Sequence, residues 1–358
     1  MRWNTEVRIG ERRVSPMAPT YFIADIAANH DGDLERAKAL IWRAKEAGAD
    51  CAKFQHFKAD QIVSGVGFAE LGAKSAHQSG WKKSVVEIYD QYHTRRSWTD
   101  ELVAACRAAD IDYMTTPYDF EAVETQLPHV PAIKIGSGDI TWHALIERCA
   151  AAGKPILLAT GAADMADVEG AVEVILSRTP DLVLMQCNTN YSGSEDNFAC
   201  VNLRVLQAFA LRWPGMVLGL SDHTPGHAAV LGAVTLGARV VEKHFTDDNA
   251  REGPDHAFAL NPRTWREMVD ATRQLEAALG TGVKIVESNE QETVVVQRRA
   301  VRARADIPAG RPLTADDLEC LRPCPADAVD PRDFNALLGR SLAAPKSAGQ
   351  ALRWTDLA

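Results

Sequence analysis

The sequence has no uninterrupted run of about 18 apolar residues, and its start, MRWNTEVRIGERR, lacks the apolar core of an export signal. We therefore expect no membrane span and predict a cytoplasmic protein. An excess of basic residues is also missing, because 39 Lys and Arg face 48 Asp and Glu, for a net charge of -9. Such a chain has little general affinity for nucleic acid or anionic membranes, so neither is expected as a partner.

Cysteine shows no sign of a disulfide framework. The seven cysteines are odd in number and scattered, which is typical of reduced thiols in a cytosolic chain. Cys320 and Cys324 come closest to a pair, but no further ligands lie nearby at the spacing of a zinc site. The cysteines that lie in apolar runs are expected in the core: Cys51, Cys106, Cys149 and Cys187.

Hydrophobic residues make up 46% of the 358 residues, enough for one large core and a second small domain. Apolar strand patterns alternate with amphipathic helical patterns such as residues 34–45. This alternation predicts an α/β fold, a (β/α)8 TIM barrel. The expected strands are 21–28, 50–56, 112–116, 132–136, 155–161, 182–187, 216–221 and 238–244.

Two segments lie outside the eightfold pattern. Residues 58–94 are too many for an ordinary connection between a strand and a helix. A loop of that length on the catalytic rim usually shapes access to the site, and the alternative is a surface excursion that only packs. The polar stretch 287–293 precedes short strand-like pieces. We predict a catalytic barrel over 1–285, a linker over 286–295 and a small domain over 296–358, which is too small to be robust unless it docks on another surface.

His223 and His244 are the strongest functional signal. Each comes just after an apolar run that is expected to be a buried strand, so in a parallel barrel both imidazoles lie on the carboxyl-terminal rim, where a divalent cation and a substrate could be held together. The alternative for each histidine is a hydrogen-bonding role at its strand end. The proximity in sequence of Ser221, Asp222 and Lys243 favours a site.

An ordered set of motifs lies at 23–33, 49–55, 115–117, 134–139, 159–161, 219–224, 242–247 and 253–255, and in the tail at 305–310, 317–323 and 337–340. Through these motifs the chain resembles the sialic acid synthase family, transferases that join phosphoenolpyruvate to an N-acetylated hexosamine to form a nine-carbon 3-deoxy-ulosonic acid. The tail resembles that family's antifreeze-like (SAF, β-clip) domain.

This resemblance implies roles for individual residues. Asp25, His223 and His244 would be catalytic, and both histidines would bind Mn2+ or Mg2+. Phosphoenolpyruvate carries a phosphate and a carboxylate, which need cations and hydroxyl or amide donors. The residues expected to bind it are Lys53, Thr116, Lys134, Ser137, Thr189 and Ser221. Those expected to bind the sugar are Gln55, Asp139, Tyr191, Asp255 and Arg322. The family's arrangement also implies a homodimer in which Arg322 completes the partner's site.

The sequence departs from the family at several positions. Asp25 and Asp139 stand where the family usually has glutamate, which withdraws each carboxylate by one methylene. Ala159 replaces a usual serine, and residues 188–192 also differ. These changes indicate a sugar pocket unlike that of the simplest N-acetylmannosamine enzymes.

The sequence also allows two other functions. Lys53 or Lys134 could form a Schiff base in a metal-independent aldolase, although the histidine pair argues against an imine. The barrel could also be a silent sugar-binding protein. The acceptor is open as well: N-acetylmannosamine, a 2,4-diacetamido-2,4,6-trideoxyhexose or a 6-phosphate. We favour an unphosphorylated sugar because no second clear basic cluster is visible, although Lys82 and Lys83 leave a sugar phosphate open.

Overall fold

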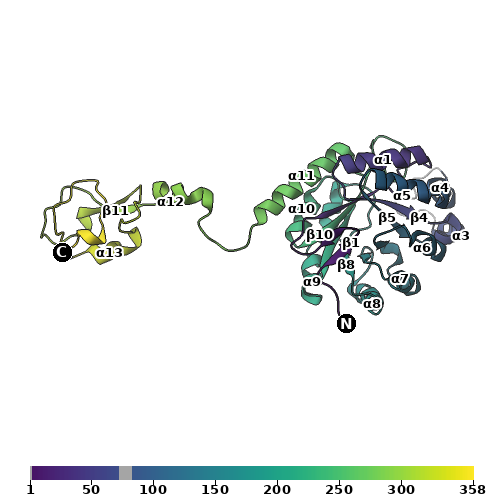
Figure 1. The fold of residues 1–358 in the computed structure, drawn as a ribbon, viewed down its shortest axis with the longest axis horizontal. Coiled ribbons are helices and arrows are strands. Elements are labelled where there is room, and N and C mark those ends of the chain that lie inside the picture. Colours follow the sequence, from purple (N-terminus) through teal and green to yellow (C-terminus); the bar gives the residue numbers. More distant parts are fainter. Residues whose placement is uncertain (1, 72–82) are drawn as a thin grey trace. The chain divides into compact units, whose positions relative to one another are not determined.

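The computed structural model describes residues 2–71 and 83–358. Lys82 therefore lies outside the described residues. The chain forms two compact units, residues 1–280 and 281–358, which are described separately (Figure 1).

The first unit is a closed barrel of parallel strands in the order β10-β3-β4-β5-β6-β7-β8-β9, which confirms the predicted TIM barrel. Its strands coincide closely with the expected ones. They are β3 Tyr21–Asp25, β4 Cys51–His56, β5 Asp112–Pro117, β6 Ile133–Ile135, β7 Ile156–Ala159, β8 Leu182–Cys187, β9 Val217–Asp222 and β10 Ala238–His244.

Helices surround the strands (Figure 1). Helix α1 illustrates why they form: Asp33 caps its first turn by accepting hydrogen bonds from the backbone N–H of Glu35 and Arg36. Its buried residues recur at helical spacing and face the barrel. The helices are α1 Leu34–Glu46, α5 Thr99–Ala108, α6 Phe120–Gln126, α7 His143–Ala150, α8 Met165–Leu176, α9 Val205–Arg212, α10 Ala228–Thr235 and α11 Pro262–Leu279.

An amino-terminal hairpin, β1 Val7–Ile9 with β2 Arg12–Val14, was not expected from the sequence. Its buried apolar side chains pack in one cluster with residues near the amino ends of the barrel strands, including Tyr21 and Cys51. The hairpin therefore closes the barrel at the amino ends of its strands.

In the described residues of the long segment after β4, the chain forms the short helices α2 Ala59–Ile62, α3 Gly65–Leu71 and α4 Val85–Tyr92. Helix α4 begins with a capping box, in which the Ser84 hydroxyl and the Glu87 carboxylate satisfy each other's backbone N–H groups.

The second unit contains α12 Gln291–Gln297, β11 Ala300–Ala303, β12 Leu318–Leu321 and α13 Phe334–Leu337. Strands β11 and β12 pair antiparallel. Part of the expected linker is thus helical. This unit has its own small core, formed by Val301, Ala303, Ile307, Leu313, Leu318, Val329, Leu337, Leu342 and Leu352.

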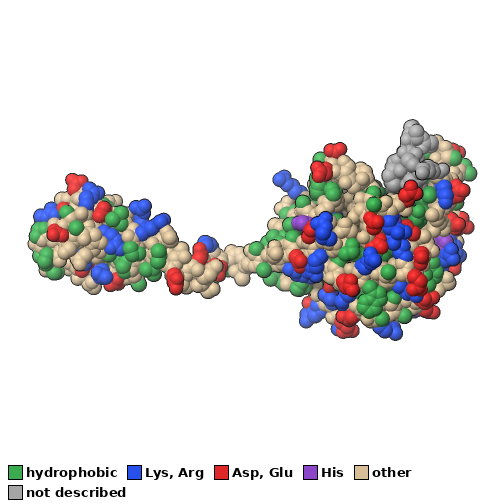
Figure 2. Space-filling model, turned by 90° about the horizontal axis from the view of Figure 1, so that it is seen from above, with side chains coloured by type: hydrophobic (Ala, Val, Ile, Leu, Met, Phe, Trp, Pro, Cys, Tyr) green, Lys and Arg blue, Asp and Glu red, His purple; other side chains and the backbone are tan. Residues whose placement is uncertain are grey.

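On the face that Figure 2 shows, acidic and basic side chains are interspersed over the barrel unit. None of the helices in the described ranges is long and apolar enough to cross a bilayer. Cys51, Cys106, Cys149 and Cys187 are buried, as predicted.

Candidate active site

A cavity of about 360 Å³ lies at the carboxyl ends of the barrel strands. Of the residues expected to form a site, it brings together all but two. Thr189 is not among its lining residues and lies beside Gly161, while Arg322 belongs to the second unit. Those that line the cavity are Asp25, Lys53, Gln55, Thr116, Lys134, Ser137, Asp139, Tyr191, Ser221, His223, His244 and Asp255.

Asp25, at the end of β3, is buried, and both of its carboxylate oxygens accept hydrogen bonds. Its Oδ2 accepts hydrogen bonds from Lys53 Nζ at 2.7 Å and from Gln55 Nε2 at 3.0 Å, and its Oδ1 accepts one from the Ala27 N–H at 3.1 Å. Burial alone would raise the pKa of Asp25, but the Lys53 charge and hydrogen bonds outweigh it, so the pKa is lowered. Asp25 is therefore a carboxylate at neutral pH.

A second carboxylate, Glu242 on β10, was missed as a site residue. Its Oε1 lies 2.8 Å from Lys134 Nζ and 3.8 Å from Lys53 Nζ and accepts a hydrogen bond from Ser221 Oγ at 3.3 Å. The period of two along a strand contained the signal, because Glu242 and His244 point to the same side of β10. The cavity thus holds two buried carboxylates and two buried ammonium groups.

Lys53 lies near both carboxylates, and burial and these two negative charges shift its pKa in opposite directions. Burial alone would lower the pKa of Lys53, but the charges of Asp25 and Glu242 raise it above its ordinary value. The lysine is therefore an ammonium group that stays charged.

His223 and His244 face each other across the cavity, with ring centroids 5.4 Å apart. Tyr191 packs edge-on against both rings, at 4.4 and 6.1 Å. Burial lowers the pKa of His244 to about 3, so its imidazole is neutral. Its Nε2 lies 3.8 Å from Asp25 Oδ2, and its Nδ1 lies 3.6 Å from Asp255 Oδ2.

His223 is oriented by the chain that follows β8. Its Nδ1 lies 2.8 Å from the Asn188 carbonyl oxygen, a contact that requires the proton on Nδ1. Burial would lower the pKa of His223, but Cys187 and the Asn188 carbonyl raise it. Metal binding at this imidazole would therefore compete with a proton.

The histidine pair fits a divalent metal. The Nδ1 of His244 is buried and has no hydrogen-bond partner, and Nε2 of His223 remains as the metal-binding nitrogen of the tautomer described above. Imidazole nitrogen is an accepted ligand of first-row metals. Within residues 2–71 and 83–358, no three His, Cys, Asp or Glu side chains are grouped as a ready metal site, so protein ligation would rest on the two imidazoles.

Asp139 closes another part of the cavity, in the short 3-10 helix η4 Ser137–Asp139. Burial raises its pKa to about 6, and its Oδ2 is buried without a hydrogen-bond partner. Beside it, Ser137 Oγ accepts a hydrogen bond from the Gly161 N–H at 2.9 Å. Asp139 is thus a carboxyl group of the cavity that changes charge near pH 6.

An apolar and aromatic wall from the described part of the long segment lines the cavity, which supports the expectation that this part of residues 58–94 shapes access to the site. Ile62 comes from α2, and Ile88, Tyr89 and Tyr92 come from α4. The ring of Phe57, just after β4, packs against Tyr89 at 5.4 Å. Sequence reasoning missed these residues because helical apolar spacing does not distinguish a cavity wall from a core.

A model described as the NeuB family matches residues 40–284, and one described as the SAF domain matches residues 298–358. The N,N'-diacetyllegionaminic acid synthase of Legionella pneumophila is 33% identical over 344 residues, which cover 94% of each chain. The N-acetylneuraminate-9-phosphate synthase of Mus musculus is 31% identical over 86% of this chain and 84% of its own. The crystal structure of an N-acetylneuraminic acid synthetase from Leptospira borgpetersenii superposes with a TM-score of 0.71 and 26% identity, over 82% of this chain and 96% of that one.

Proposed function

This chain belongs to the NeuB family, and on that basis we propose that it condenses phosphoenolpyruvate with an N-acetylated hexosamine aldehyde. The products would be a nine-carbon 3-deoxy-ulosonic acid and phosphate. The observation that carries the proposal is the meeting of two buried lysines and a buried histidine pair in one cavity. The lysines suit an anionic donor and the histidines suit a metal-assisted carbonyl reaction.

Lys53 and Lys134 would hold the phosphate and carboxylate of phosphoenolpyruvate, with hydroxyl groups of Thr116, Ser137 and Ser221 as further donors. Each lysine is paired with a protein carboxylate, at 2.7 Å for Asp25 and 2.8 Å for Glu242. For Lys53, the charges of Asp25 and Glu242 raise the pKa, so it would stay charged until the anionic substrate joins it. Thr189, beside Gly161, would complete the donor set after a small shift.

Bound at His223 and His244, Mn2+ or Mg2+ would polarise the aldehyde carbonyl of the open-chain sugar. Carbon 3 of phosphoenolpyruvate would form a bond to the aldehyde carbon, and water oxygen would form one to carbon 2. Asp25, held as a carboxylate, would accept the water proton. The bond from carbon 2 to the phosphate oxygen then breaks, and the two protons of the water end on the former aldehyde oxygen and on phosphate.

The sugar would lie between the histidine pair and the aromatic wall, in contact with Gln55, Asp139, Tyr191 and Asp255. We propose an unphosphorylated acceptor, because Lys53 and Lys134 are the only Lys or Arg side chains that line the cavity within the described ranges. Lys83 instead donates to Gln91 Oε1 at 2.7 Å. The two cavity lysines are already assigned to phosphoenolpyruvate.

The Schiff-base alternative fits the site less well. An imine forms from a neutral amine, whereas the neighbouring carboxylates raise the pKa of Lys53 and keep it as ammonium. We also propose a homodimer in which Arg322, from the second unit, completes the partner's sugar site.

The proposal is tested by incubating the purified protein with phosphoenolpyruvate and a panel of acceptors. The panel contains N-acetylmannosamine, its 6-phosphate and a 2,4-diacetamido-2,4,6-trideoxyhexose, and the readouts are phosphate release and thiobarbiturate-reactive product. We expect turnover of an unphosphorylated sugar that EDTA abolishes and Mn2+ or Mg2+ restores. Full activity after chelation, with borohydride trapping of Lys53 or Lys134, would select the aldolase. Binding of phosphoenolpyruvate without phosphate release would select the silent barrel.

A further inference from the structure

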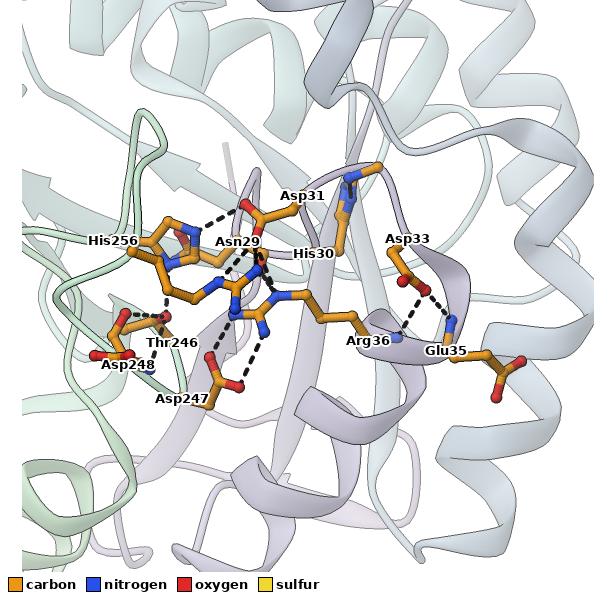
Figure 3. A network of polar contacts seen from close by, with 12 residues as sticks. Asn29, His30, Asp31, Asp33, Glu35, Arg36, Thr246, Asp247, Asp248 and His256 are labelled. Carbon is orange, nitrogen blue, oxygen red and sulfur yellow. Dashed lines mark hydrogen bonds and ion pairs between the residues drawn. The ribbon is translucent and has the colours of Figure 1, made fainter.

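Two loops of the catalytic rim are joined by a polar network outside the cavity (Figure 3). One loop, residues 26–33, follows β3, and the other, residues 245–261, follows β10 and carries Asp255. Arg36 spans them: its Nε donates to the Asn29 carbonyl at 2.8 Å and its Nη1 to Asp247 Oδ2 at 3.0 Å.

Asp31 is the centre of this network. Its Oδ1 lies 2.9 Å from His256 Nε2, and its Oδ2 accepts a hydrogen bond from Arg251 Nε at 2.9 Å and lies 3.2 Å from Arg36 Nε. His256 and Arg251 both belong to the second loop. One carboxylate therefore fixes that loop at two points, on either side of Gly253 and Asp255.

His256 is fully buried and has a partner on each ring nitrogen. Its Nδ1 lies 2.7 Å from Thr246 Oγ1, and its Nε2 lies 2.9 Å from Asp31 Oδ1. A neutral ring with its proton on Nε2 satisfies both contacts. Gly253 lies against this ring, and a Cβ at Gly253 would come within 2.6 Å of His256 Cδ2. These contacts fix the position of the His256 ring, and the ring in turn fixes the loop 245–261 that carries it.

The backbone of the first loop is turned by two non-glycine residues with positive φ, Ala27 at 43° and Asp31 at 54°. Such a conformation is unfavourable for an alanine and persists only where the surroundings impose it. Here it directs successive amides at two cavity carboxylates. The Ala27 N–H donates to Asp25 Oδ1 at 3.1 Å, and the Ala28 N–H donates to Asp255 Oδ2 at 3.2 Å.

We propose that Asp31 and His256 are positioning residues that fix the loop 245–261 and thereby hold Asp255 beside His244. The inference rests on the proposed function, in which Asp255 contacts the acceptor sugar. Neither Asp31 nor His256 lines the cavity, so both act through the loop. Phosphoenolpyruvate would be bound by the lysines of β4 and β6, which the loop does not carry.

The separation of donor and acceptor sites gives a sharp expectation for kinetics. Asp31→Asn keeps the shape of the side chain but removes the charge that faces Arg36 and Arg251. His256→Ala removes both ring contacts, and Gly253→Ala displaces the ring without removing a polar group. Each variant should raise the KM for the acceptor about ten- to a hundredfold, because a small misplacement of a binding group has effects of that order. The KM for phosphoenolpyruvate should stay within about twofold of that of the unmodified protein. His256→Gln keeps a donor towards Asp31 and should recover part of the loss.

Hydrogen exchange provides the readout that does not depend on turnover. Without substrates, amides of residues 247–259 should exchange faster in Asp31→Asn and in His256→Ala than in the unmodified protein, while the rest of the barrel is unchanged. Glu276→Gln is the matched control, because Glu276 is a partly buried carboxylate that pairs with Arg273 and the Thr20 N–H near the amino end of β3. It should change neither loop exchange nor acceptor KM.

The proposal is overturned if exchange in 247–259 is unchanged, if it rises throughout the barrel, or if both KM values rise together. If the unmodified protein turns over no acceptor, the proposed function fails, and the exchange result still decides whether the loop is fixed in this way.

Discussion

At the scale of single residues, the cavity combines two buried carboxylates with two buried lysines. Asp25 and Lys53 form one pair, and Glu242 and Lys134 form the other, with Lys53 within 3.8 Å of Glu242 as well. Removing one partner of a buried pair leaves an uncompensated charge, which costs about 3–5 kcal/mol in general.

Glu242→Gln should therefore destabilise the free protein and strengthen its response to phosphoenolpyruvate. The neutral amide leaves Lys134 without a counter-charge, and the substrate would supply one. We expect a lower Tm without ligand and a larger rise in Tm with phosphoenolpyruvate than in the unmodified protein, measured by thermal unfolding. A rise equal to or smaller than that of the unmodified protein would count against lysine-based binding of the donor.

Asp139 predicts a pH dependence of stability. Burial raises its pKa to about 6 in the folded state, from an ordinary value near 4. The folded state therefore binds the proton more tightly, and its stability falls as pH rises from about 4 to about 6. Asp139→Asn lacks this loss, which amounts to at most about 3 kcal/mol for a shift of that size.

The measurement is the difference in Tm between Asp139→Asn and the unmodified protein at several pH values. The difference should increase in favour of Asp139→Asn between pH of about 4 and 6.5 and then stay constant, and other titrating groups cancel in it. A difference that is independent of pH would mean that Asp139 is not a buried acid.

The sequence identified individual candidate site residues that lie within the barrel strands or at their carboxyl ends, because these ends meet at one rim when the strands are parallel. Asp25, Lys53, His223 and His244 are examples, and all line the cavity. Glu242 was missed because only the histidine of its motif was considered. Side chains alternate along a strand, so Glu242 was expected on the same side of β10 as His244. Thr189 illustrates the reverse, since its position depends on loop geometry that no local pattern specifies.

At the scale of elements, the close approach of three strand ends depends on Gly161. A Cβ there would lie 2.5 Å from Thr189 Cγ2, 2.9 Å from Ser137 Oγ and 3.1 Å from Cys187 Sγ. Glycine is required because the chain after β7 passes between the ends of β6 and β8.

Gly161→Ala should therefore shift Ser137, whose hydroxyl accepts the Gly161 N–H, and weaken donor binding. We expect the KM for phosphoenolpyruvate to rise by about tenfold or more, and the KM for the sugar to change less. The control is Gly170→Ala inside α8, where the added Cβ meets only the His143 side chain, at 3.3 Å. Equal effects of the two substitutions would show that the crowding at Gly161 has no functional role.

Strand positions were predictable because strands buried on both faces appear as apolar runs. The residues at which the strands end were less predictable. Residues 21–28 were expected as one strand, but β3 ends at Asp25 because Ala27 adopts a positive φ that turns two amides towards carboxylates. The hairpin of β1 and β2 was missed because strands of three residues are too short to show a period.

At the scale of the whole molecule, the chain consists of two compact units, and the smaller one has only a small apolar core of its own. The eightfold barrel was predictable because each β/α unit repeats the same alternation. A completion of the site by a second chain is not predictable in this way, since a single sequence does not contain a partner's position. The resemblance to sialic acid synthases is what suggests that Arg322 acts across a dimer.

Arg322 in trans predicts complementation. Arg322→Ala and His223→Ala should each be nearly inactive, but mixed chains should form heterodimers in which one site keeps both groups. We expect measurable recovery of phosphate release after subunit exchange, whereas mixing Arg332→Ala, a surface arginine of the same unit, with His223→Ala should add nothing beyond the activity of the Arg332→Ala chains. Demonstrated exchange without recovery would place Arg322 in its own chain's site or outside any site.

In the proposed reaction, the bond between carbon 2 and the phosphate oxygen of phosphoenolpyruvate breaks. Phosphoenolpyruvate that carries 18O at the oxygen between carbon 2 and phosphorus shows directly whether this bond is the one that is cleaved. With the accepted sugar and Mn2+ or Mg2+ present, mass spectrometry or 31P NMR should find the label in the released phosphate. Unlabelled phosphate, or no phosphate from any acceptor, would contradict the account.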